Sequence, residues 1–127
     1  MVTTTTATTV GQRLVDLCRE GKHTEAINEL YADDVVSVEA APMEGMPQTM
    51  KGKEAVMGKN NWWAENNEVH NATTEGPFPH GDDKFAAFFF FDTTFKPTGQ
   101  RMEMKEVGLY TIENGKIAKE EFFYQSG

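Results

Sequence analysis

The stretch LYTIENGKIAKEEFFY, residues 109–124, decides the fold of the second half of the chain. Two segments rich in β-branched and aromatic residues flank the four residues ENGK, 113–116. An Asn-Gly pair favours the tight turn of a β-hairpin, because both central positions of that turn need a positive φ. The sequence therefore predicts two antiparallel strands, one over residues 100–112 and the other over 117–124.

The segments before this hairpin have the same character. Residues 84–95 form a long apolar stretch, and residues 68–74 are a further strand candidate. PFPHGDD (77–83) and KPTG (96–99) lie between the segments and are rich in Gly, Pro and Asp, which is typical of turns. The second half is thus expected to be an antiparallel meander.

The first half is expected to be mostly helical. Apolar residues recur at helical spacing from Val10 to Cys18, and Gly21 is placed to end that helix. Thr24 is a candidate cap for a second helix, and a third helix is predicted over residues 53–66. The second helix would bury Ala26, Ile27, Leu30 and Tyr31.

A short β-branched strand (35–40) and a loop rich in Pro and Gly (42–52) separate the second and third helices. Helices followed by a meander define an α+β fold.

Composition limits the classes of function. A chain of 127 residues with 39% hydrophobic and 25% charged residues fits one globular domain, 1–127, with residues 1–9 as a frayed arm. The formal net charge of -8 argues against nucleic acid or an anionic membrane as partner. The single cysteine, Cys18, excludes an internal disulfide, and three dispersed histidines give no metal-ligand spacing.

The chain also lacks targeting signals at the level of sequence. MVTTTTATTV (1–10) has neither the basic start nor the apolar block of a signal peptide, and the longest apolar run, 86–91, is too short to span a membrane. A cytoplasmic protein without a cofactor is therefore the expectation.

The strand AAFFFF (86–91) is apolar on both faces. Such a run is typical of a strand that is covered on two sides, but three short helices can cover only one face of an antiparallel sheet. A homodimer through the outer face of the sheet is therefore expected, because an uncovered phenylalanine strand invites aggregation.

The order of these segments resembles a known family. Two helices lead into LYADDVVSVEAAP (30–42), GKEAV (52–56) opens a third helix, and the strands close with residues 109–124. This order is similar to the SnoaL-like branch of the nuclear transport factor 2-like superfamily, over about residues 10–125. The resemblance implies a cone in which a curved, mainly antiparallel sheet wraps around three N-terminal helices.

Members of that superfamily include ketosteroid isomerases, limonene-epoxide hydrolases, polyketide cyclases and scytalone dehydratases, so the fold alone does not define a reaction. The resemblance to the isomerases places Glu39 at the position of their catalytic base. The alternation of residues in its strand does not decide whether Glu39 faces the pocket or water.

Glu106 lies on the apolar side of its strand, with Met104, Tyr110 and Ile112. The isomerases carry a protonated acid on a comparable strand, and a carboxyl buried without a cation stays protonated. The alternatives are a strand bulge that exchanges the two faces, or a Glu106 paired with a neighbouring lysine or with His70.

Further side chains are candidates for the pocket. His70 is a possible base or hydrogen-bond donor, and of the adjacent Trp62 and Trp63 only one can point fully inward. The other candidate wall residues are Phe88, Phe90, Tyr110, Phe122 and Tyr124.

No known active site of the family is complete in this sequence. The first-helix tyrosine of the isomerases corresponds to Leu14, and none of the three arginines matches the Asp-Arg-Asp arrangement of the epoxide hydrolases. The expected function is the binding of a small, largely apolar molecule, with cofactor-free proton transfer by Glu39 as base while Glu106 and Tyr110 polarise a carbonyl. The alternative is a non-catalytic dimeric binding or scaffolding module.

Overall fold

Three helices and six strands follow one another in a computed structural model, which describes residues 7–42 and 45–124. The two first helices and the first strands are α1 (Ala7–Arg19), α2 (His23–Leu30), β1 (Tyr31–Val38) and β2 (Thr49–Lys51). They are followed by α3 (Lys53–Asn66), β3 (Asn67–Pro79), β4 (Lys84–Phe95), β5 (Gln100–Glu113) and β6 (Lys116–Phe123). The α+β class and the order of the elements are as predicted.

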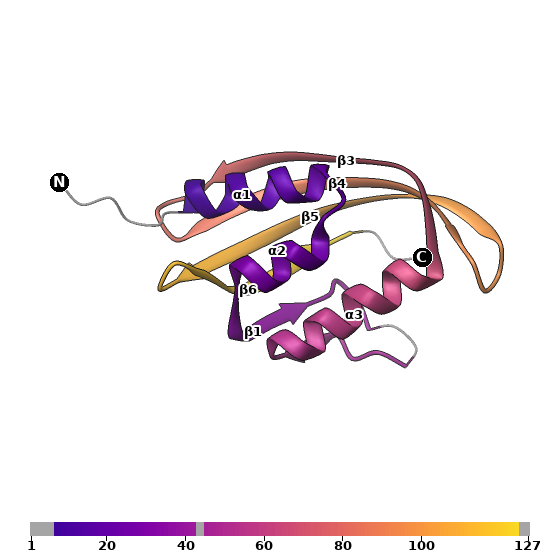
Figure 1. Ribbon diagram of the computed structural model, residues 1–127, viewed down its shortest axis with the longest axis horizontal. Coiled ribbons are helices and arrows are strands. Elements are labelled where there is room, and N and C mark those ends of the chain that lie inside the picture. The colour runs from indigo at the N-terminus through magenta and orange to yellow at the C-terminus, as the bar shows by residue number, and fades with distance from the viewer. Residues whose placement is uncertain (1–6, 43–44, 125–127) are drawn as a thin grey trace.

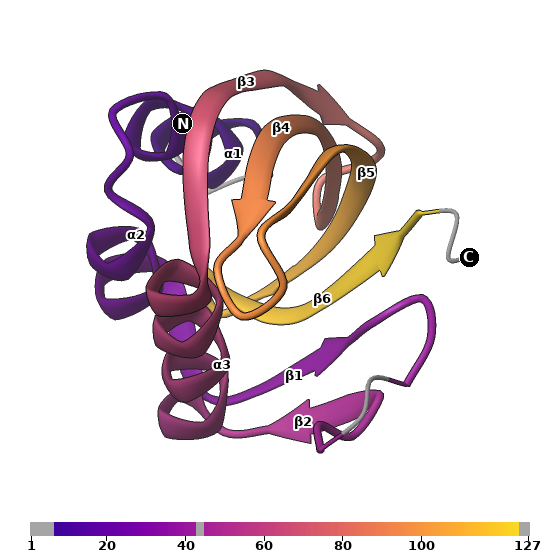
Figure 2. The same cartoon turned by 90° about the vertical axis from the view of Figure 1, so that its right-hand side faces the viewer.

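The strands form one six-stranded sheet in the order β2-β1-β6-β5-β4-β3. Within the described residues β1 and β6 pair in parallel, and the other neighbouring strands are antiparallel. The sheet curls strongly, and the three helices lie along its concave side (Figures 1 and 2). This is the predicted cone, with an unclosed, mainly antiparallel sheet.

The hairpin between β5 and β6 forms as the Asn-Gly pair predicts. Asn114 has a φ of 52° and Gly115 a φ of 77°, so both central residues of the turn have the positive φ that such a turn requires. Glu113 pairs with Lys116 next to the turn, the register shifts by one residue between Thr111 and Ile112, and Tyr110 pairs with Glu120 beyond that shift. This register determines which side chains of the two strands face the helices.

The hydrophobic core lies between α1, α2 and the concave face of the sheet. Its helical half comes from the apolar stripes of α1 and α2, which carry Leu14, Val15 and Ile27, among others. Its sheet half contains aromatic side chains, of which Phe85 and Tyr110 stack with ring centroids 4.8 Å apart. The core therefore closes one end of the cone and leaves the end next to α3 more open.

Several local predictions were wrong. Residues 7–9 belong to α1, with Ala7 fully buried, rather than to a frayed arm, while residues 1–6 lie outside the described part. Thr24 does not cap α2, because that helix begins at His23. The loop over residues 42–52 contains the short strand β2, and Tyr31 begins β1 instead of ending the second helix.

None of the helices in the described part of the chain has the length and apolar character needed to cross a bilayer.

Gly108 allows the close packing of Tyr110 on the concave face of β5. A Cβ at position 108 would lie 2.8 Å from Cε2 and 3.0 Å from the hydroxyl oxygen of Tyr110. Tyr110 is 2% exposed, so its ring has no free space into which it can move. A glycine is therefore needed here to make room for a buried ring, two residues away on the same face.

We expect Gly108→Ala to destabilise the protein by about 1–3 kcal/mol, the usual cost of overpacking a core. Gly58→Ala is the matched control, because a Cβ on that exposed residue of α3 meets nothing within 4 Å. This control should gain roughly 0.5–1 kcal/mol from its higher helix propensity. The free energy of unfolding from urea titration measures both, and equal stability of the two variants would contradict the assignment.

Candidate functional site

A cavity of about 720 Å³ lies between the three helices and the concave face of the sheet. Its walls are largely apolar, with aromatic rings from α3, β4 and β6. Its polar lining residues include three carboxyl groups, one lysine and three tyrosines: Glu39, Glu106, Glu120, Lys59, Tyr31, Tyr110 and Tyr124. An apolar cavity with a few converging polar groups is the usual form of a small-molecule site.

Glu106 points into this cavity from the middle of β5. No hydrogen bond or ion pair reaches its carboxyl group from any other residue that the structure describes. Burial, assisted by the negative charges of Glu39 and Glu120 and opposed by the charge of Lys59, raises the pKa of Glu106 to about 7. Glu106 can therefore bind or release a proton near neutral pH, a property that suits proton transfer.

Glu39, just after β1, is part of an ion pair with α3. The Lys59 ammonium lies 2.8 Å from Oε2 of Glu39, and both side chains are only 15% exposed. The other oxygen, Oε1, accepts a hydrogen bond of 3.1 Å from the hydroxyl of Tyr124. Both carboxylate oxygens of Glu39 are therefore engaged by cavity-lining groups, unlike those of Glu106.

Glu120 is a buried carboxyl group at the floor of the cavity. It is 2% exposed and accepts hydrogen bonds from the hydroxyl of Tyr31 and, at 2.6 Å, from Oγ of Ser37. Burial raises the pKa of Glu120, and these hydrogen bonds oppose that shift. Sequence reasoning missed Glu120, although it shares its side of β6 with the predicted wall residues Phe122 and Tyr124.

Cys18 of α1 and His23 of α2 meet at another part of the cavity wall, where Sγ lies 3.5 Å from Nδ1. Burial, assisted by the charge of Glu120, raises the pKa of the Cys18 thiol to about 12. Burial also lowers the pKa of His23. At neutral pH this pair is therefore a neutral thiol beside a neutral imidazole, which is a poor nucleophile.

The structure brings most of the proposed site residues together. The cavity wall includes Glu39, Glu106, Trp62, Trp63, Tyr110, Phe122 and Tyr124. The two tryptophans differ as expected for neighbours on a helix. Trp63 packs against the wall residue Phe91 with centroids 5.2 Å apart, whereas Trp62 is 37% exposed and contacts Phe95.

Three predicted residues lie outside the cavity wall. His70 is exposed on β3, and its Nε2 lies 2.7 Å from Oγ1 of Thr94. Phe88 and Phe90 were expected to line the pocket, but Phe89 and Phe91 do so instead. The register explains this correction, because Phe89 lies opposite the inward-facing Glu106, and alternation turns Phe88 and Phe90 to the convex face.

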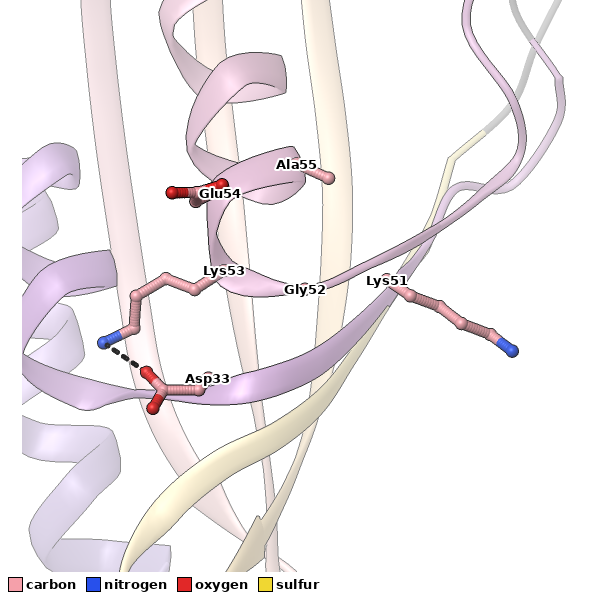
Figure 3. A pocket seen from close by; sticks show the side chains of 6 residues that line it. All are labelled: Asp33, Lys51, Gly52, Lys53, Glu54 and Ala55. Atoms are coloured by element: carbon pink, nitrogen blue, oxygen red, sulfur yellow. Dashed lines mark ion pairs between the residues drawn. The ribbon is translucent and has the colours of Figure 1, made fainter.

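Other parts of the described surface offer no comparable site. A hollow at the start of α3 is formed by mostly exposed side chains, including the Lys53–Asp33 pair at 3.8 Å, and Lys51 extends away from this pair (Figure 3). Among the described residues, no three His, Cys, Asp or Glu side chains are grouped so that they could hold a metal ion.

The fold is the cone of the nuclear transport factor 2-like superfamily. The sequence model of the SnoaL-like domain family matches residues 4–124, so the chain belongs to the SnoaL-like family. No curated protein matches the chain.

Solved structures show the same fold. A protein from Mesorhizobium loti, provisionally named a SnoaL-like polyketide cyclase and also a carbohydrate phosphatase, is 46% identical, with a TM-score of 0.84 over 91% of this chain and 96% of that one. A provisionally named isomerase from Bacillus subtilis is 17% identical, with a TM-score of 0.74 over 94% and 86%. A computationally designed 17-OHP binder is 23% identical, with a TM-score of 0.71 over 94% and 92%.

The raised pKa of Glu106 leads to a pH-dependent stability. Its folded-state pKa of about 7 exceeds the ordinary value of 4.5, so the unfolded chain loses this proton first as the pH rises. The free-energy cost that Glu106 adds to folding is absent below pH 4.5. It grows between pH 4.5 and pH 7 and stays constant above pH 7. Glu106→Gln should therefore gain stability relative to the parent protein over that interval.

The pKa of Glu106 can be measured directly as the midpoint of a pH titration of its side-chain carboxyl ¹³C chemical shift. We expect it near 7, and higher in Lys59→Met, because the Lys59 charge lowers this pKa. Glu103→Gln, on the exposed face of the same strand, is the control and should leave the midpoint unchanged. A midpoint below 5 in the parent protein would contradict the burial of this carboxyl group.

Proposed function

We propose that the protein binds a small, largely apolar carbonyl compound in the cavity and catalyses cofactor-free proton transfer on it. The observation that carries this proposal is the Glu106 carboxyl group, which has no hydrogen bond or ion pair with the residues that the structure describes. Its pKa is about 7, and the charge of the Lys59 ammonium acts on it. A base works best when its pKa lies near the working pH. The cyclase and isomerase names of similar structures support the same class of reaction.

In the proposed step, the Glu106 carboxylate removes a proton from the carbon next to the carbonyl group. The electron pair of the broken C–H bond forms the C=C bond of an enolate, and the carbonyl oxygen takes the negative charge. If the compound carries a C=C bond next to that carbon, the enolate is conjugated, and Glu106 returns the proton to its far end, which completes an isomerisation. Alternatively, the enolate carbon attacks a second carbonyl carbon, which closes a ring, and Glu106 gives its proton to the alkoxide that forms. Hydrogen bonds to the enolate oxygen lower the barrier of such a step.

Lys59 is the proposed donor to that oxygen. Its ammonium has three N–H groups, and Ser37 and Glu39 accept two of them, at 2.7 and 2.8 Å. No other residue within 7–42 and 45–124 accepts a hydrogen bond from Lys59, so the third N–H group is available to a ligand. These roles differ from the expectation that Glu39 is the base and Glu106 polarises the carbonyl, because Lys59 and Tyr124 already engage Glu39.

The alternative function is a non-catalytic binding module with the same cavity. One observation favours it: the designed 17-OHP binder of similar fold binds its ligand by design. A protein of this kind would bind planar ketones through the aromatic walls, without transferring protons. A test of proton transfer therefore separates the two functions.

Hydrogen–deuterium exchange at the α-carbon of 2-tetralone provides that test, because this planar ketone needs no further reaction partner. We expect the protein to speed this exchange in D₂O above the buffer rate, with kcat/KM rising to a plateau above pH 7 as Glu106 ionises. Glu106→Gln should lower kcat by about 10²–10⁴-fold, the usual contribution of a positioned base.

Glu103→Gln is the control for charge and should keep full activity, since Glu103 lies on the exposed face of β5. Binding of 2-tetralone, followed by tryptophan fluorescence, should persist in Glu106→Gln. Binding without exchange in the parent protein would favour the non-catalytic module, and the absence of both would overturn the proposal for this class of ligand.

We also propose that two copies of the chain associate through the convex face of the sheet. Phe88, Val107 and Phe123 lie side by side across β4, β5 and β6, and Val107 and Phe123 are 41% and 53% exposed. Lys105 and Glu121 flank this row on the same face, so a two-fold-related copy can pair opposite charges around an apolar centre.

Sedimentation velocity at micromolar concentration tests this association. We expect a dimer for the parent protein and a monomer for Val107→Lys, because a charge at the centre of an apolar interface is strongly unfavourable. Met102→Lys on the same strand is the control: Met102 is 41% exposed but lies on the opposite side, so this variant should remain a dimer. A monomeric parent protein would refute the association.

A further inference from the structure

Glu120 is a buried charged group that the proposed reaction does not use directly. Burying a carboxylate is costly unless each oxygen has a donor, and here the two donors come from β1. Tyr31 donates to Oε1 and Ser37 to Oε2. Ser37, the second of these donors, also contacts Lys59 in the cavity wall.

Ser37 connects Glu120 to Lys59. The Lys59 ammonium lies 2.7 Å from Oγ of Ser37, and Ser37 Oγ lies 2.6 Å from Oε2 of Glu120. An ammonium group can only donate, so the Ser37 oxygen accepts from Lys59 and its own proton must go to Glu120. The chain of hydrogen bonds therefore has one direction, from the cavity to the buried carboxylate.

Lys59 is thus held from two sides. Glu39 forms an ion pair with its ammonium, and Ser37, which is hydrogen-bonded to Glu120, accepts a hydrogen bond from it. The centroid of the Phe122 ring lies 5.5 Å from the ammonium. A lysine side chain is otherwise flexible and loses rotamer entropy when it is fixed. Two fixed acceptors leave one N–H with a defined direction.

We propose that Glu120 is a positioning residue, which acts through Ser37 to hold the Lys59 ammonium in place so that its free N–H serves a ligand in the cavity. This inference rests on the proposed function for the use of that N–H, but the positioning itself is a separate property of the chain. The bond from Tyr31 offers an internal comparison, because it reaches the other oxygen of Glu120 and has no link to Lys59.

The experiment measures the exchange of the Lys59 ammonium protons with water by ¹H–¹⁵N correlation spectroscopy of lysine side chains at pH 6. The signal that disappears in Lys59→Met identifies the residue. We expect Ser37→Ala to speed this exchange by about tenfold, as the loss of one hydrogen bond to a charged group implies. Glu120→Gln should have a similar effect, because the amide is a weaker acceptor for the Ser37 proton.

Tyr31→Phe is the matched comparison, since it removes the other donor to Glu120 within the same buried region. It should lower stability but leave Lys59 exchange within about twofold of the parent value, because the path through Ser37 is intact. Glu103→Gln should change neither the stability of the protein nor the exchange rate of the Lys59 protons. Ser37→Ala keeps the test decisive if Glu120→Gln does not fold.

Unchanged Lys59 exchange in Ser37→Ala would overturn the proposal, as would equal acceleration in Tyr31→Phe and Ser37→Ala, which would indicate general loosening. These outcomes do not depend on turnover. If the parent protein exchanges 2-tetralone, Ser37→Ala should lower kcat by about tenfold with little change in KM, because the Lys59 donor, which Ser37 no longer holds in place, acts on the enolate rather than on the ketone. If it does not, the proposed function fails while the positioning of Lys59 stands.

Discussion

The register between β5 and β6 is the constraint on which the site depends. The positive φ angles at Asn114 and Gly115 set the turn, and a shift of the register by one residue between Thr111 and Ile112 then brings Tyr110 opposite Glu120 and Gly108 opposite Phe122. A shift by one residue would turn every side chain of a strand to the other face. If β6 slipped by one residue against β5, Glu120 would face solvent, and Phe123, which now lies on the convex face, would turn toward the helices.

The three carboxyl groups of the cavity have different surroundings and therefore different properties. Glu39 forms a direct ion pair with Lys59, and Glu120 accepts hydrogen bonds from two hydroxyl groups. Within the described part of the chain, Glu106 has neither kind of partner and is influenced by the charges of Glu39, Glu120 and Lys59. The positive charge of Lys59 acts on all three carboxyl groups.

Much of the fold follows from local sequence patterns. The third helix and the strand over residues 84–95 have the predicted bounds, because periodicity and turn residues mark them clearly. Glu106 was placed correctly on the inner side of its strand by the alternation of its neighbours, since no bulge intervenes between Gln100 and Thr111 in the pairing with β4.

The remainder of the site depends on contacts between distant segments. Lys59 has no distinctive neighbours in sequence, and its partners Ser37 and Glu39 lie about twenty residues earlier, on another element. Alternation could not decide between the two faces of AAFFFF, because both are apolar, and so Phe88 and Phe90 were assigned to the wrong side. The parallel pairing of β1 with β6 likewise has no local signature.

That pairing of β1 with β6 affects how the protein can form during synthesis. Glu120 follows Tyr31 by 89 residues and Ser37 by 83, so both hydroxyl groups leave the ribosome long before their acceptor does. Until the sixth strand is made, β1 has only β2 beside it in the sheet. The nascent chain can form its helices early, but the cavity becomes complete only when translation has passed residue 120.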